Sequence, residues 1–145
     1  MKNKNIIIFA CNSLHPYYNY YYPAIMDYKF INTEYLDSVS GGDLEIIYEL
    51  VNLFKEQSVE IYNEMQSHFS VKNYKMLGFL AHKAKSSVLI MGMNDLGLTL
   101  KTFEIQARDE KESYLYESYI TRFKTETEAA ITELDDLVNN HLNRN

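Results

Sequence analysis

The sequence predicts an all-α protein, most simply an antiparallel four-helix bundle with a short helix in front of it. From Tyr28 onward, apolar residues recur at spacings of three and four, which is the period of an amphipathic helix. Residues typical of helix caps separate these stretches. Beyond a short run at residues 5–9, no segment has the two-residue period of a strand. Long helices with short connections pack most simply as a bundle.

Residues 1–26 differ from the rest of the chain. They hold a short apolar run at 6–9, both prolines and a tyrosine-rich segment at 17–22, without a helical period. Two lysines before the apolar run resemble a secretory signal, but a signal peptide needs roughly 7–15 apolar residues. We interpret residues 1–26 as an unassigned, disordered N-terminal extension and residues 27–145 as one helical domain.

The first two helices are marked by their caps. A short helix is predicted over residues 33–38, where Asn32 or the following threonine can cap the first turn. The glycine pair at 41–42 ends it. Asp43 is a good N-cap for a long second helix that runs to about residue 69. Its inward positions are Leu44, Ile47, Val51, Phe54, Ile61 and Met65, with Ser58 in the one gap of the series.

Three further helices follow. The third covers residues 74–91, with Asn73 as its cap and Gly92 placed to end it in a left-handed conformation. The fourth extends from about 94 to 108, and the fifth from 113 to about 141. The inward positions of the fourth helix are Leu96, Leu100, Phe103 and Ala107. Those of the fifth are Leu115, Tyr119, Phe123, Ala130, Leu134, Leu137 and Val138.

The charge is distributed unevenly. With 14 Lys and Arg against 20 Asp and Glu, the net charge of −6 argues against nucleic acid as a partner. No acidic residue lies between Glu64 and Asp95, and this interval contains the basic residues Lys72, Lys75, Lys83 and Lys85. The third helix is therefore basic in an acidic protein. Because the chain has a single cysteine and no apolar run of about 20 residues, we expect a soluble, cytoplasmic protein without a membrane partner.

The third helix carries a histidine opposite its core face. Each helical residue advances about 100°, which collects Leu77, Leu80, Ala81, Ala84, Val88 and Met91 on one stripe. His82 lies roughly 160° from the middle of this stripe. The same outward side holds Lys75 and Ser86 and, at its edges, Gly78, Phe79, Lys85 and Leu89. Because an exposed histidine in the middle of a helix has no packing role, His82 is a candidate for a chemical role.

Several chemical roles leave recognisable traces in a sequence. A metal site on a helix needs a second ligand three or four residues away, and the residues there are Gly78, Phe79, Lys85 and Ser86, so no metal is expected. A general base needs a pocket and a group that holds the imidazole. No glycine-rich phosphate loop or hydrolase motif occurs in the sequence. A histidine that accepts a phosphoryl group needs only accessibility, a neutral ring and nearby cations.

The neighbours of His82 suit phosphoryl acceptance. Lys85 supplies a cation at i+3, and Ser86 at i+4 can donate a hydrogen bond to a phosphoryl oxygen. Because Gly78 and Ser86 are small, a partner's active site could approach the ring. The predicted docking residues are Gly78, Phe79, Lys75, Lys83 and Leu89. Alternatively, Phe79 and Leu89 pack against neighbouring helices or the N-terminal extension.

These residues resemble the signature of histidine-containing phosphotransfer (HPt) domains. That signature has an Ala-His pair, then Leu, Lys, Gly and Ser at the second to fifth positions after the histidine, and Gly at the tenth. The matching residues are Ala81, His82, Lys85, Ser87 and Gly92. Ala84 stands in place of Leu, and Ser86 in place of Gly. The resemblance covers about residues 28–141 and includes Leu36, the segment 41–43 and Phe54.

The resemblance implies a four-helix bundle whose His82 takes a phosphoryl group from an aspartate of one receiver domain and passes it to another. It implies response-regulator receiver domains and a hybrid histidine kinase as partners. The receiver would supply Mg²⁺ and the catalytic machinery, so the chain would be a phosphocarrier without a cofactor, not an enzyme. We expect a monomer, because a bundle with its own core needs no partner chain.

Two alternatives stay open. The phosphoacceptor helices of sensor histidine kinases usually have Glu directly after the histidine and Pro a few residues later, whereas this chain has Lys83 and Val88. A helical interaction module that binds a receiver or kinase without phosphotransfer would not need the histidine.

Overall fold

The computed structural model describes residues 28–142, and their side chains up to residue 140. Within this range the chain forms five α-helices and one short 3-10 helix, and no strand occurs there. They are α2 (Thr33–Ser40), α3 (Leu44–Ser70), α4 (Tyr74–Ile90), α5 (Asn94–Arg108), η3 (Ser113–Leu115) and α6 (Tyr116–Leu142). The prediction of an all-α protein is confirmed. The interpretation of residues 1–26 falls outside the described residues.

Side-chain caps set the helix boundaries close to the predicted ones. The side chains of Asn32, Asp43 and Asn73 each accept a hydrogen bond from a backbone N–H in the first turn of α2, α3 and α4. These N–H groups have no partner inside the helix, so the caps stabilise each start. Gly41 ends α2 in a left-handed conformation with φ of 65°. All three predicted N-caps are confirmed.

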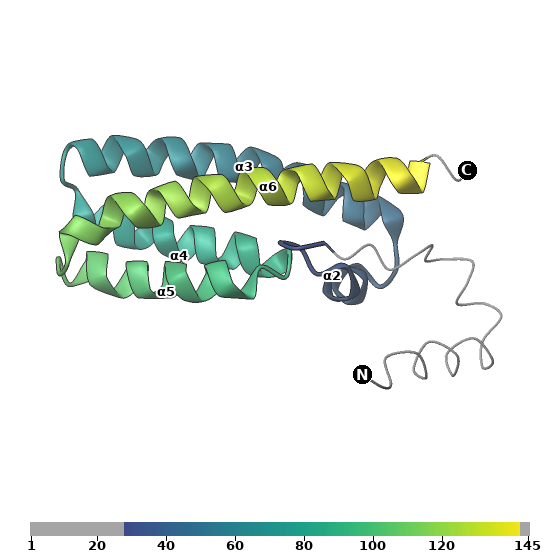
Figure 1. Cartoon of the computed structure of the whole chain (residues 1–145), viewed down its shortest axis with the longest axis horizontal. Coiled ribbons are helices and arrows are strands. Elements are labelled where there is room, and N and C mark those ends of the chain that lie inside the picture. The colour runs from purple at the N-terminus through teal and green to yellow at the C-terminus, as the bar shows by residue number, and fades with distance from the viewer. Residues whose placement is uncertain (1–27, 143–145) are drawn as a thin grey trace, which may run out of the picture.

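The four longer helices surround one core. Each of α3, α4 and α5 contacts the next helix along the chain, and α6 contacts both α5 and α3. The helices α3 and α6 have 27 residues each, against 17 in α4 and 15 in α5. At about 1.5 Å per residue, α3 and α6 are about 40 Å long and α4 and α5 about 25 Å. Figure 1 shows α4 and α5 along one end of the longer pair, with α2 near the other end.

The predicted inward positions are mostly buried. In α3, five of them and Ser58 are buried, and the Ser58 hydroxyl donates to the carbonyl oxygen of Phe54 at 2.7 Å. All four positions in α5 are buried. Leu44, Tyr119, Leu137 and Val138 are partly buried against the core. The periodic pattern of the sequence therefore predicts most of the core correctly.

The start of α6 corrects one prediction. Leu115 was predicted to point inward, but Tyr116 and Ile120 are buried there instead. The 3-10 turn at η3 shifts the register, because its residues turn more tightly than those of an α-helix. The Tyr116 hydroxyl lies 2.7 Å from the carbonyl oxygens of both Gln106 and Lys111, so either oxygen can accept its one hydrogen. Its polar end is thereby satisfied while its ring fills the core.

The segment before α2 is tied to α6. The carboxylate of Glu133 accepts hydrogen bonds from the backbone N–H groups of residues 29–31 at 2.9 to 3.1 Å. The Tyr28 hydroxyl donates to Asp136 at 2.9 Å, and burial together with this carboxylate raises the pKa of Tyr28 to about 12. The chain therefore enters the described domain at a fixed place on α6.

The same segment also contacts the turn that ends α4. The backbone N–H of Asn32 donates to the carbonyl oxygen of Met91 at 3.1 Å. Gly92 has φ of 76°, and a Cβ atom there would lie 2.5 Å from Cβ of Asn32. Glycine is required at this position both for its backbone conformation and for this close approach. The predicted role of Gly92 as the residue that stops α4 is confirmed.

No helix in the described part of the chain is sufficiently long and apolar to cross a membrane.

Candidate functional site

His82 lies in the middle of α4 and points away from the core. Its side chain is 51% exposed, whereas Ala81 beside it is fully buried. The predicted outward residues Lys75, Phe79, Ser86 and Leu89 are exposed as well. The helical count therefore placed the histidine correctly.

A buried carboxylate that the sequence analysis did not identify holds the imidazole. Glu104 of α5 has a side chain only 9% exposed, and its Oε1 lies 2.9 Å from Nδ1 of His82. Lys85 Nζ lies 2.9 Å from the other oxygen, Oε2. Arg108, one turn further along α5, places Nη2 2.9 Å from Oε1. One carboxylate thus joins the histidine to two cations from two helices.

The charges around Glu104 keep it ionised. Burial acts to raise the pKa of this carboxyl, but hydrogen bonds from Lys85 and His82, together with their charges, outweigh burial. The pKa of Glu104 therefore lies below its ordinary value. An ionised carboxylate accepts hydrogen bonds and donates none.

This contact fixes the tautomer of His82. Because Glu104 accepts, Nδ1 of the ring must be the donor, and in a neutral imidazole the lone pair then belongs to Nε2. The ammonium group of Lys85 is 3.4 Å from Nδ1, but its hydrogen bond goes to Glu104. The arrangement orients the ring and makes Nε2 the nitrogen that can act as a nucleophile.

The predicted position of Gly78 on the docking surface was wrong. It was placed at the edge of the outward docking surface, but it is buried between α4 and α5. A Cβ atom there would lie 2.7 Å from Cγ of Arg108 and 3.2 Å from the carbonyl oxygen of Glu104. The missing side chain therefore lets α5 approach α4 closely, beside the carboxylate that contacts His82.

The predicted serines have different surroundings. Ser86 is exposed, and its hydroxyl donates to the carbonyl oxygen of His82 at 3.2 Å, within its own helix. It would have to rotate about χ1 to reach a phosphoryl group. Ser87 is buried and donates to Oε1 of Gln57 on α3 at 3.2 Å. Ser87 thus helps to hold α4 against α3.

Lys83 lies on the opposite side of α4 from Glu104. Its ammonium group is 3.4 Å from a carboxylate oxygen of Glu60 on α3, and both side chains are substantially exposed. Such a pair contributes about 0–1 kcal/mol. Of the two lysines near the histidine in sequence, only Lys85 therefore belongs to the His82 site.

Exposed apolar side chains lie on both helices of the site. Phe79 is 57% exposed, and Leu89 is exposed although it also contacts Gly97 of α5. On α5, Leu98 is 67% exposed and Ile105 lies two turns further along the helix, also exposed. The contacts of Glu104 with His82 and of Gly97 with Leu89 place these α5 residues alongside α4. The contribution of α5 to this outer surface was not predicted from the sequence.

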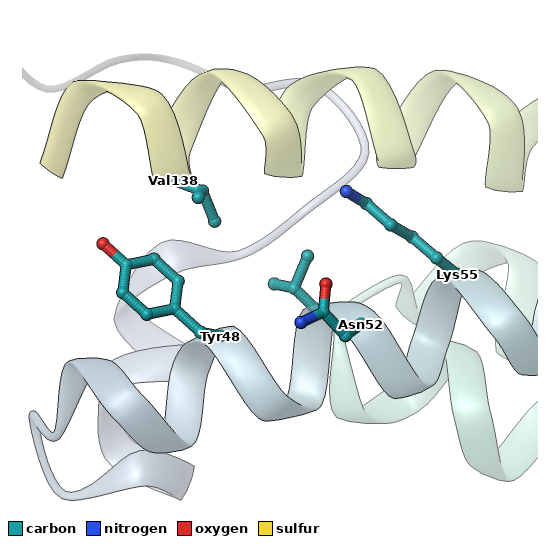
Figure 2. A pocket seen from close by; sticks show the side chains of 5 residues that line it. Tyr48, Asn52, Lys55 and Val138 are labelled. Atoms are coloured by element: carbon teal, nitrogen blue, oxygen red, sulfur yellow. The ribbon is translucent and has the colours of Figure 1, made fainter. Parts of the chain in front are cut away.

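A hollow of about 220 Å³ lies away from this site, between α3 and α6. Figure 2 shows Tyr48, Asn52 and Lys55 of α3 facing Val138 of α6 around it. Lys55 is paired with Asp135 of α6. His82 is not among the lining residues, so this hollow does not extend the histidine site.

Among residues 28–140, no group of three or more His, Cys, Asp or Glu side chains is arranged to hold a metal ion. Comparisons with protein-family models, curated proteins and solved structures found no match.

Proposed function

We propose that this chain is a phosphorelay intermediate of the HPt type, with α3 to α6 as its antiparallel four-helix bundle and His82 as phosphoacceptor. The observation that carries the proposal is the hydrogen bond between Nδ1 of His82 and the buried carboxylate of Glu104. This contact leaves the lone pair on Nε2 of a half-exposed ring. A nucleophile for a partner's phosphoryl group needs this arrangement.

The transfer step follows from the tautomer. The lone pair of Nε2 attacks the phosphorus of an aspartyl phosphate on a receiver domain, an N–P bond forms, and the P–O bond to the aspartate breaks. The aspartate leaves as a carboxylate. The ring acquires positive charge, which Glu104 stabilises through the Nδ1–H that it already accepts. Transfer to a second receiver reverses these steps, and Mg²⁺ bound by the receiver would neutralise phosphoryl charge.

Two cations near the ring can offset the negative charge of a phosphoryl group on Nε2. Lys85 and Arg108 both contact Glu104, so the cluster around the ring has two cations against one carboxylate. A phosphoryl group on Nε2 adds negative charge beside them. We assign Lys85 to phosphoryl stabilisation, with Ser86 as a hydrogen-bond donor after rotation of its hydroxyl.

The surrounding surface suits an acidic partner. The exposed apolar residues Phe79, Leu89, Leu98 and Ile105 can anchor a docked domain. The exposed basic residues Lys75, Lys101 and Arg108 belong to the same two helices. Complementary charge favours encounter and register more than it adds affinity. We therefore propose receiver domains, which carry an acidic pocket, as the partners.

A phosphotransfer assay tests the proposal. Receiver domains charged with radiolabelled phosphate should transfer label to the wild-type chain, and His82→Gln should stay folded by circular dichroism yet accept none. His68→Gln is a matched control, because His68 lies in the last turn of α3, outside the site. Label on the His82→Gln variant would refute the assignment. If receivers bind both proteins and neither accepts label, the chain is an interaction module without phosphotransfer.

A further inference from the structure

The Nδ1–H group of His82 donates to a carboxylate that carries no hydrogen of its own. Oε1 of Glu104 lies 2.9 Å from Nδ1, and the Glu104 side chain is only 9% exposed. Because its pKa is lowered, this carboxyl is ionised near neutral pH, where it accepts hydrogen bonds and donates none. Lys85 and Arg108 each lie 2.9 Å from one of its oxygens and hold it in place. The contact with Glu104 therefore requires a hydrogen on Nδ1.

Phosphorylation of the ring makes this requirement important. Before transfer, the neutral ring of His82 has a hydrogen on Nδ1 and a lone pair on Nε2. Once Nε2 is bonded to phosphorus, the ring is cationic for as long as Nδ1 keeps its hydrogen. Loss of that hydrogen would leave a lone pair on Nδ1 facing the ionised carboxylate of Glu104 at 2.9 Å, with no proton between the two acceptors. The contact therefore opposes neutralisation of the phosphorylated ring.

The cations around the ring act in the opposite direction. Lys85 Nζ lies 3.4 Å from Nδ1, although its hydrogen bond goes to Glu104, and Arg108 adds a second cation at Oε1 of Glu104. The other charged side chains along this part of α4 and on the helices packed against it are Lys75, Lys83 and Lys101, with Glu60 paired to Lys83 on the α3 side. Among residues 28–140, the charged groups within hydrogen-bond distance of the ring are thus one anion, Glu104, and one cation, Lys85.

We propose that Glu104 keeps the proton on Nδ1 of His82 while Nε2 carries the phosphoryl group, so that the chain holds phosphate on a cationic, reactive ring. The inference rests on the proposed function and adds to it how readily the phosphoryl group leaves. From the cationic ring, a carboxylate oxygen of the receiver attacks phosphorus and an O–P bond forms. The N–P bond breaks, and its electron pair returns to Nε2. The leaving group is a neutral imidazole whose Nδ1–H still donates to Glu104.

The same proton makes the phosphorylated chain sensitive to water. When the attacking oxygen belongs to water, inorganic phosphate is released and the proton of the water passes to solvent. From a neutral ring, the electron pair of the N–P bond would instead produce an imidazolate anion beside the ionised Glu104, which the like charge disfavours. Transfer and hydrolysis are therefore both fast with the charge of Glu104 and slow without it. The phosphorylated chain is a short-lived carrier near neutral pH.

Phosphorus NMR on the full chain tests the inference without a receiver. Potassium phosphoramidate donates a phosphoryl group to accessible histidines, and the signal that is absent from His82→Gln is assigned to His82. The chemical shift of this signal follows protonation of the ring as the pH is varied. Glu104→Gln keeps the shape of the side chain and removes its charge. It should move the midpoint of the titration to lower pH by about one pH unit.

The lifetime of the phosphoryl group is a second measurement on the same samples. Above the midpoint the rate of loss follows the protonated fraction, so Glu104→Gln should lose phosphate about tenfold more slowly than wild type. Lys85→Gln should move the midpoint to higher pH, because it removes a cation 3.4 Å from Nδ1. Glu60→Gln is the matched control and should leave midpoint and lifetime unchanged, since Glu60 contacts Lys83 on the α3 side. A purely structural role of Glu104 would not produce opposite shifts in these two variants.

The outcomes separate this inference from the proposed function. Equal midpoints for wild type and Glu104→Gln, or a shift to higher pH, would overturn the inference, and so would a wild-type chain that takes no phosphate on His82. If the midpoints are equal but receivers transfer label to His82, the inference fails and the proposed function stands. If the midpoint moves as expected but receivers transfer no label, the proposed function fails, whereas the role of Glu104 on a phosphorylated ring holds.

Discussion

The two sides of α4 differ in how the polar residues that they contact are buried and paired. Towards α5, the carboxylate of Glu104 is 9% exposed and contacts His82, Lys85 and Arg108 at 2.9 Å each. Towards α3, Glu60 is 57% exposed and has one contact with Lys83 at 3.4 Å. Both sides pair lysine with glutamate. Only the α5 side combines burial, several partners and a titratable ring, and these properties make it a site.

The backbone explains part of this difference. A Cβ atom on Gly78 would come close to the backbone of Arg108 and Glu104, so α4 and α5 can approach only because the side chain is absent. Gly97 allows a second close approach, to Leu89. On the α3 side, Ser87 makes a buried polar contact with Gln57, but no carboxylate is enclosed. Close backbone packing is what encloses Glu104.

Removal of the buried carboxylate should have the largest effect on stability. Glu104→Ala leaves Lys85 and Arg108 without their shared partner, and we expect a loss of about 1–3 kcal/mol in the free energy of unfolding, measured with urea. Phosphotransfer should slow as well, because His82 loses its orientation. Glu60→Ala is the control and should cost about 0–1 kcal/mol. Equal losses in the two variants would show that burial of Glu104 is not important.

The two glycines should respond differently to substitution. Gly78→Ala forces backbone atoms of α5 to move, which costs about 1–3 kcal/mol before the helix propensity of alanine offsets about 1 kcal/mol. In Gly97→Ala the new methyl group meets only the side chain of Leu89, which is at the surface and can rotate. We expect Gly78→Ala to have the lower thermal midpoint. The reverse order would show that α4 and α5 have room at Gly78.

The stability contributed by the Glu104 charge should depend on pH. Because its folded pKa is lowered from 4.5, the contribution is complete above that value and is lost as pH falls through the folded pKa. Below about pH 5, the difference in urea stability between wild type and Glu104→Gln should shrink as the buffer becomes more acidic. Taking the difference reduces the effect of the other carboxyls. A difference that grows on acidification within this range would contradict the assigned direction.

The comparison of Lys85 with Lys83 should show the smallest effects, but it tests the His82 site most specifically. Lys85→Ala should slow phosphotransfer, because it removes a cation beside the ring, and should also cost some stability, because the buried Glu104 carboxylate loses one of its partners. Lys83→Ala should leave the rate of transfer close to that of wild type, since Lys83 contacts Glu60 on the other side of α4. Single-turnover transfer from a phosphorylated receiver measures both. Equal transfer rates for wild type and Lys85→Ala would show that Lys85 contributes only its contact with Glu104 and has no role in transfer.

The sequence was sufficient for the helices and for the outward direction of His82. Both follow from local rules: caps satisfy the first N–H groups of a helix, and the 3.6-residue period separates the inner face from the outer face. The inward position of Tyr116 was not predicted, because the 3-10 turn before it changes that period. Gly78 did leave a signal, since glycine inside a helix costs about 1 kcal/mol relative to alanine and therefore suggests close packing.

The sequence by itself determined that the chain is helical, that one basic helix presents an exposed histidine, and which residues accompany it on that helix. Only the tertiary structure decided which carboxylate meets the ring. Glu104 is 22 residues from His82 in the chain, and its spacing to Arg108 looks like an ordinary surface pair. The distance between α4 and α5, set by Gly78, encloses that carboxylate and turns an exposed histidine into an oriented one.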